Sequence, residues 1–92
     1  MSDTAQQIEI FREFAENELR NHMAELNTRY QNRELASDDL GEQAVQEHRQ
    51  NFRKEMEEKI DELLTDENQY LRPALSGMTE RFLEKLRLTH QA

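Results

Sequence analysis

Apolar side chains recur at steps of three and four residues along most of this chain, which is the spacing of one face of an α-helix. In the helix predicted over residues 3–31, the stripe consists of Ile8, Phe11, Ala15, Leu19, Met23, Leu26 and Tyr30. Ile10 and Phe14 lie beside this stripe and widen the apolar face. A face of this width predicts contact with more than one neighbouring helix.

A second stripe predicts a helix over residues 39–64. Its members are Val45, His48, Phe52, Met56, Ile60 and Leu63. Polar and small residues, among them Ser37 and Gly41, separate the two stripes and predict a turn over about 32–38. Glu42 follows Asp39 by three residues, which is the spacing of a capping box at a helix start.

The pattern over residues 68–89 predicts a third helix that is kinked or broken. Its stripe consists of Leu71, Leu75, Met78, Phe82 and Leu86. Pro73 marks a helix start or a kink, because its ring fixes the backbone and removes an N–H donor. Ser76 and Gly77 weaken the early part of the helix, so the firm portion is predicted to begin at about residue 78.

Together these elements predict one all-α domain over residues 1–92, a three-helix up-down bundle built on an antiparallel helical hairpin. The third helix packs on the hairpin within the chain or exchanges with a partner subunit. A chain of 92 residues has room for only a modest core. Because the first helix also has a wide apolar face, we expect a homodimer to complete the bundle.

The hairpin has a register that can be predicted. A turn centred near Leu35 places Phe11 opposite Ile60, and it places His22 opposite His48. Large and small apolar residues then alternate along one seam, as close helix packing prefers. The two histidines therefore fall together inside an otherwise apolar seam.

Three interpretations of His22 and His48 are open. The pair could bind a transition metal with Glu18 or Glu25 as a carboxylate ligand, or it could act as a pH switch. Neither histidine follows the Glu-x-x-His spacing of di-iron bundles. The pattern therefore favours a structural polar layer, in which each ring keeps a nitrogen on water or on a carboxylate. We expect no metal ion and no cofactor.

Composition narrows the class of protein. Charged residues make up 35% of the chain, cysteine is absent and the formal net charge is -8. Such a charge repels phosphate groups, so we expect protein partners and no direct binding to nucleic acid or membrane. No apolar run is long enough to cross a bilayer, and the first residues lack the pattern of a signal peptide, so a cytoplasmic location is expected.

The acidic residues are the remaining candidates for function. Residues 38–67 hold eleven acidic and four basic side chains. Helical spacing assigns Glu55, Glu58 and Glu62 to a water-facing outer surface, a candidate interaction face without a catalytic pocket. We therefore expect a small non-enzymatic interaction module such as an adaptor, a chaperone or a regulatory subunit. The alternative is an acidic mimic of nucleic acid that inhibits a DNA- or RNA-handling protein.

Overall fold

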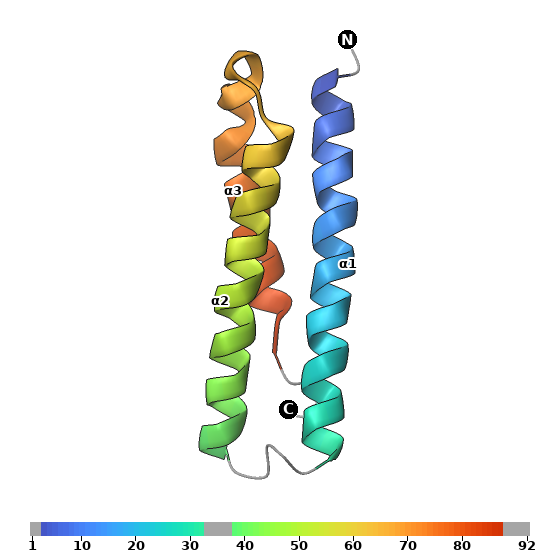
Figure 1. Cartoon of the computed structure of the whole chain (residues 1–92), viewed down its shortest axis with the longest axis vertical. Coiled ribbons are helices and arrows are strands. Elements are labelled where there is room, and N and C mark those ends of the chain that lie inside the picture. Colours follow the sequence, from blue (N-terminus) through green and yellow to red (C-terminus); the bar gives the residue numbers. More distant parts are fainter. Residues whose placement is uncertain (1–2, 33–37, 88–92) are drawn as a thin grey trace.

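A computed structural model describes residues 3–32 and 38–87, and this part of the chain is helical almost throughout. Figure 1 shows its elements, with no strand among the described residues. They are α1 (Asp3–Gln31), α2 (Asp38–Leu63), the 3-10 helix η1 (Asp66–Leu71) and α3 (Arg72–Lys85). The predicted all-α fold of three helices is thus confirmed.

The long helices α1 and α2 run antiparallel, side by side, along the length of the molecule (Figure 1). No glycine or proline interrupts α1, and its apolar stripe has a continuous partner on α2. The rings of His22 and His48 meet with their centroids 5.0 Å apart, as the predicted register requires. The predicted turn centred near Leu35 lies outside the described residues.

The helical segment after α2 was predicted to start at about residue 68, but η1 starts at Asp66. Thr65 is extended, and its backbone N–H donates to the side-chain oxygen of Asn68 at 2.5 Å. Asn68 has non-helical backbone angles, φ -118° and ψ 22°, which is the kink expected in this region. α3 then begins at Arg72, with Pro73 in the first turn, where a missing N–H leaves no helical hydrogen bond unmade. The predicted firm start at about residue 78 is therefore wrong.

The third helix also ends earlier than the predicted residue 89. α3 stops at Lys85, and Leu86 has an extended backbone with φ -83° and ψ 99°. Arg49 of α2 donates a hydrogen bond to the carbonyl oxygen of Leu83 at 2.8 Å, which occupies an acceptor of the last turn. Leu86 is only 1% exposed, so the side chain that follows the helix is still part of the core.

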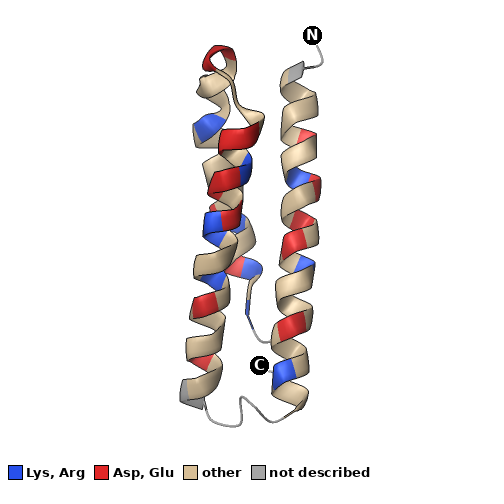
Figure 2. Cartoon of the chain, in the orientation of Figure 1, with Lys and Arg blue, Asp and Glu red and all other residues tan. Residues whose placement is uncertain are grey.

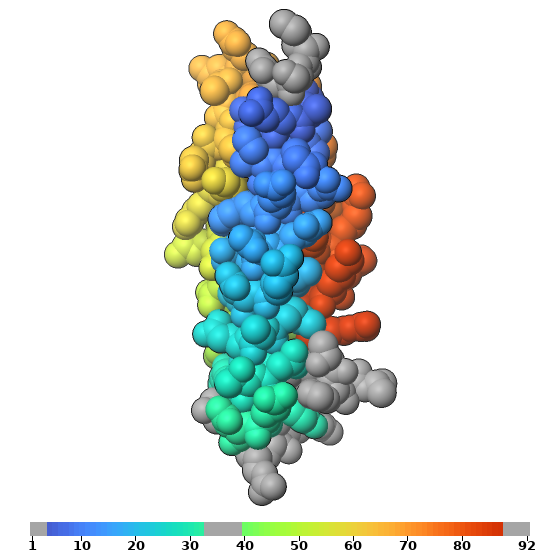
Figure 3. All heavy atoms as spheres, turned by 90° about the vertical axis from the view of Figure 1, so that its right-hand side faces the viewer, coloured from blue at the N-terminus to red at the C-terminus, as the bar shows by residue number. Residues whose placement is uncertain are grey.

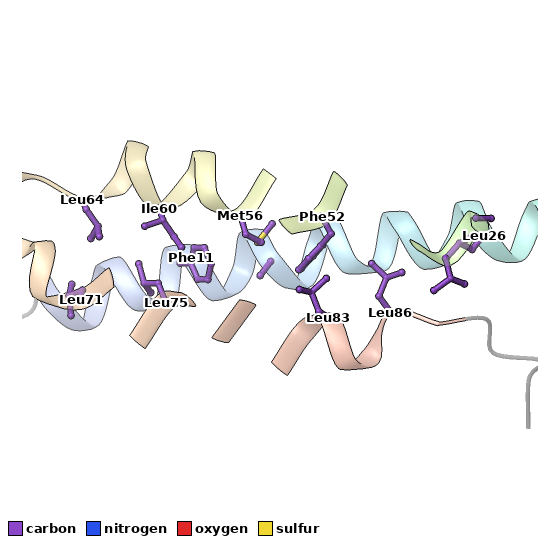
Figure 4. Close-up of a cluster of buried hydrophobic side chains, with 13 residues drawn as sticks. Phe11, Leu26, Phe52, Met56, Ile60, Leu64, Leu71, Leu75, Leu83 and Leu86 are labelled. Carbon is purple, nitrogen blue, oxygen red and sulfur yellow. The ribbon is translucent and has the colours of Figure 1, made fainter. Parts of the chain in front are cut away.

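The core is one cluster to which every helical element contributes (Figure 4). Figure 3 shows α1 at the front of the molecule, with α2 along one side and α3 along the other. The wide apolar face of α1 thus has two neighbours within the same chain. The width of this face no longer requires a second subunit, and the homodimer stays a prediction. The buried apolar residues are Phe11, Ala15, Leu26, Ala44, Val45, Phe52, Met56, Ile60, Leu64, Leu71, Leu75, Leu83 and Leu86.

None of the helices in the described ranges combines the length and the apolar character needed to cross a membrane.

Candidate functional site

Two histidines interrupt the apolar core between α1 and α2. His22 is 7% exposed and His48 is 9% exposed. Their Nδ1 atoms lie 2.7 Å apart, which is a hydrogen-bond distance, and the rings stand nearly perpendicular at 83°. The predicted juxtaposition of His22 and His48 is therefore found in the structure.

A glutamate extends this pair. The Nε2 atom of His22 lies 2.8 Å from a carboxylate oxygen of Glu55 on α2. The sequence pattern assigned Glu55 to the outer surface, but the side chain is partly buried and reaches His22, whereas Glu58 and Glu62 are exposed as expected. Glu55 flanks the buried stripe of α2, three residues after Phe52, and this flanking position was the available signal. We call His22, His48 and Glu55 the histidine layer.

Burial is the main influence on the protonation of His48. It lowers the pKa of His48 below the ordinary value of 6.5, and the neighbouring His22 lowers it further. Arg29 acts in the same direction, whereas Glu25 and Glu47 oppose the shift. His48 is therefore uncharged at neutral pH, and its ring can serve as a hydrogen-bond partner or a metal ligand.

Glu18 lies at the other end of the network, one turn before His22. Burial raises its pKa above 4.5, and the charge of Glu55 and a hydrogen bond with Glu55 raise it further, while His22 opposes the shift. The raised pKa of Glu18 thus results mainly from its partial burial and secondly from the neighbouring carboxyl group. The sequence named Glu18 only as a possible ligand and did not predict its contact with Glu55.

Acidification should destabilise the protein through His48. The folded-state pKa lies below the unfolded value of 6.5, so the unfolded chain binds more protons as the pH falls through 6.5. The stability present above pH 6.5 is then lost toward the lower folded-state pKa. Glu18 has the opposite sign, because its raised pKa gives stability that is lost as the pH rises above 4.5.

Urea unfolding of the wild type and of His48→Leu between pH 5 and 8 measures this dependence. We expect the decline below pH 6.5 to be smaller in His48→Leu than in the wild type. Glu18→Gln serves as the control, because it removes the opposing contribution and should make the decline steeper. Equal declines in the wild type and in His48→Leu would assign the effect to other groups.

Two sets of side chains in this region could hold a metal ion. In the first set, His22, His48 and Glu25 each offer one ligand atom, and these atoms lie within 4.8 Å of one another. The second set meets the same limit with His22, Glu18 and Glu55. His22 belongs to both sets, with His48 and Glu25 as its co-ligands in one and Glu18 and Glu55 in the other. Imidazole and carboxylate groups in this combination suit a divalent transition metal.

A second feature is the concentration of acidic side chains at the end of α2 and in η1 (Figure 2). Residues 57–67 contain six carboxylates, all exposed, and a single lysine, Lys59. Asp61 pairs with Arg72 at 2.8 Å and Glu62 pairs with Lys59 at 3.5 Å, while the other four make no ion pair with a described residue. We call this surface the acidic pole; it consists of Glu57, Glu58, Asp61, Glu62, Asp66 and Glu67.

A shallow groove of about 230 Å³ lies between α1 and α3. Met78 and Phe82 provide its apolar part, and the Nζ atom of Lys85 lies 5.5 Å from the centre of the Phe82 ring. Arg12, Arg81 and Glu16 complete the lining. The groove thus combines two apolar side chains with three basic and one acidic side chain, so its charge is opposite to that of the acidic pole.

Comparison of the chain with protein-family models, curated proteins and solved structures gives no match.

Proposed function

We propose that this chain is a small non-enzymatic helical module that binds another protein, as an adaptor, a chaperone or a regulatory subunit. The acidic pole is the observation that carries the proposal. Four of its carboxylates, on Glu57, Glu58, Asp66 and Glu67, have no basic partner among the described residues. A surface of this kind complements a basic surface on a partner, and we place the encounter in the cytoplasm.

Electrostatics gives such a surface a definite role. Like charges held close together on a rigid helix create a field that attracts a basic partner and accelerates association. α2 is rigid here because Phe52, Met56 and Ile60, on its opposite face, are buried in the core. Screening by salt weakens this attraction, so binding through the pole should decline steeply with ionic strength.

Charge reversal of the pole tests the proposal. Partners are first captured from a native lysate at low salt, identified and purified. Glu57→Lys, Glu58→Lys and Glu62→Lys are then combined in one variant, which leaves Glu55 in the histidine layer untouched. We expect Kd for the purified partner to rise at least about tenfold, mainly through slower association, because the attraction becomes a repulsion.

A matched control reverses three exposed glutamates outside the pole, Glu13, Glu42 and Glu84. This variant has the same net charge as the pole variant, and its Kd should stay close to that of the wild type. An equal loss in both variants would mean that the overall charge, and no local surface, governs binding. Circular dichroism confirms that each variant is folded.

The groove offers a contrasting mode of binding. If the partner inserts an apolar segment between α1 and α3, Met78→Ala and Phe82→Ala will weaken binding while the pole variant binds normally. That result would show that the partner binds in the groove and that the acidic pole is not the binding surface.

A second candidate function is mimicry of nucleic acid, and the same row of exposed carboxylates along α2 favours it. The partner would then be a DNA- or RNA-handling protein whose basic site the acidic pole occupies. Competition with duplex DNA or with RNA for the purified partner distinguishes the two functions, because only a mimic is displaced.

The oligomeric state, predicted to be a homodimer, is measured by analytical ultracentrifugation.

A further inference from the structure

The two imidazoles of the histidine layer face each other through the same ring atom. The Nδ1 atoms of His22 and His48 lie 2.7 Å apart in a buried seam between two rigid helices. Glu25, which is exposed, lies one turn beyond His22 on α1, and one of its carboxylate oxygens lies within 4.8 Å of one ring nitrogen of His22 and of one ring nitrogen of His48. Two imidazoles and a carboxylate from the two helices are thus close enough together to share one ion.

Glu55 determines which nitrogen of His22 carries the proton. A carboxylate only accepts hydrogen bonds, so the Nε2 atom of His22, 2.8 Å from Glu55, must be the donor. The Nδ1 atom of the neutral ring then carries a lone pair directed at His48. The single proton between the two rings therefore belongs to the Nδ1 atom of His48.

We propose that a divalent transition-metal ion, for which Zn²⁺ is the probe, replaces this proton and is bound by His22, His48 and Glu25. Both rings coordinate through Nδ1, and water completes a tetrahedral site on the side of the exposed Glu25. The displaced proton moves through solvent to the Nε2 atom of His48, so that ring stays neutral. Glu55 becomes the carboxylate that orients His22 from behind the metal.

The geometry requires only a small change. Tetrahedral Zn²⁺ with bonds of about 2.0 to 2.1 Å holds two ligand nitrogens about 3.3 Å apart. The present separation of the Nδ1 atoms is 2.7 Å. Small rotations of the two side chains supply the difference without moving either helix.

The donor set selects the kind of metal. Two imidazoles and one carboxylate suit Zn²⁺, Co²⁺, Ni²⁺ or Cu²⁺, whereas Mg²⁺ and Ca²⁺ prefer oxygen ligands alone. The ligand spacing differs from that of di-iron bundles, which is why the sequence pattern favoured a purely structural layer. The contact of Glu55 with His22 is the new observation, because it fixes the lone pair where the metal binds.

The alternative set of His22, Glu18 and Glu55 is less suitable. It offers one imidazole in place of two, through the Nε2 atom that Glu55 already engages. The two sets differ in the ring nitrogen that they use, and this difference can be measured.

Thermal unfolding of the full chain with Zn²⁺ provides the first test. At a Zn²⁺ concentration 100-fold above Kd, the melting temperature should rise by about 10 to 20 °C, because the ion binds the folded state. Equal concentrations of Mg²⁺ should leave it unchanged. His48→Gln and Glu25→Gln should lose most of the Zn²⁺ response, whereas the matched changes His90→Gln and Glu47→Gln should retain it.

NMR of the imidazole nitrogens in the wild type provides the second test and does not depend on any variant folding. Zn²⁺ should shift the Nδ1 resonances of His22 and His48 and leave both Nε2 atoms protonated. The proposal is overturned if the melting temperature does not respond to Zn²⁺, if His48→Gln responds as the wild type does, or if His22 coordinates through Nε2. The charge reversals of the acidic pole should retain the Zn²⁺ response, which separates this site from the proposed function.

Discussion

Phe52→Ala should lower the free energy of unfolding by about 3 to 5 kcal/mol. Phe52 is 0% exposed and lies near the middle of α2, where its ring meets that of His22 edge to face with centroids 6.1 Å apart. Truncation removes the buried ring and leaves a cavity, which the long helices can close only by moving closer together along their whole packed length. Folded proteins have total stabilities of about 5 to 15 kcal/mol, so this single change should remove a large fraction of the stability.

Urea unfolding followed by circular dichroism measures this loss. Phe82→Ala serves as the control, because it removes the same ring from a partly buried position at the groove beside Lys85. Its effect should be clearly smaller. Similar losses for the two variants would mean that the centre of α2 is packed no more tightly than the edge of α3.

Replacing His22 alone or His48 alone should each lower the free energy of unfolding by more than half of what the double replacement does. His22→Leu leaves the buried N–H of His48 without its acceptor and Glu55 without its donor. An unsatisfied buried polar group destabilises a protein by about 1 to 3 kcal/mol. In the double variant His22→Leu with His48→Leu, apolar side chains fill the seam and no buried N–H of the pair is left unpaired.

The double variant should therefore lose less stability than the sum of the two single variants, by about 0.5 to 3 kcal/mol. The three variants and the wild type form a double-mutant cycle, measured by urea unfolding at pH 7.5 with a chelator present. Additive losses would show that the contact between the two Nδ1 atoms contributes nothing of its own.

The register of the hairpin was predictable because both long helices carry unbroken apolar stripes. Once Phe11 is placed opposite Ile60, the regular rise of the two helices brings His22 to His48. No tertiary information was needed for this juxtaposition. The predicted α2 also agrees with the observed helix to within one residue at each end.

Glu55 was misplaced because helical spacing resolves the direction of a backbone position and not the reach of its side chain. A glutamate beside the buried stripe can extend toward water or turn along the helix surface to a polar partner. Its partner, His22, comes from the other helix. Spacing along α2 alone carries no information about that contact.

The end of α3 could not be predicted for a similar reason. No glycine or proline follows Lys85, so the local sequence permits the helix to continue. Tertiary contacts stabilise the observed end: Arg49 donates to the carbonyl of Leu83, and the backbone N–H of Arg87 donates to the sulfur of Met23 at 3.4 Å instead of to a helical carbonyl. These groups come from α2 and α1 respectively.

The short link through η1 has a consequence for how the chain reaches this structure. η1 follows α2 almost directly and leads into α3. This short connection keeps α2 and α3 close together before they pack against each other. Bundles dominated by such local contacts fold in microseconds to milliseconds. The contacts between α1 and the α3 region, such as that of Met23 with Arg87, join more distant parts of the sequence than the contacts within the α1–α2 hairpin do, and we expect that loop closure to govern the rate.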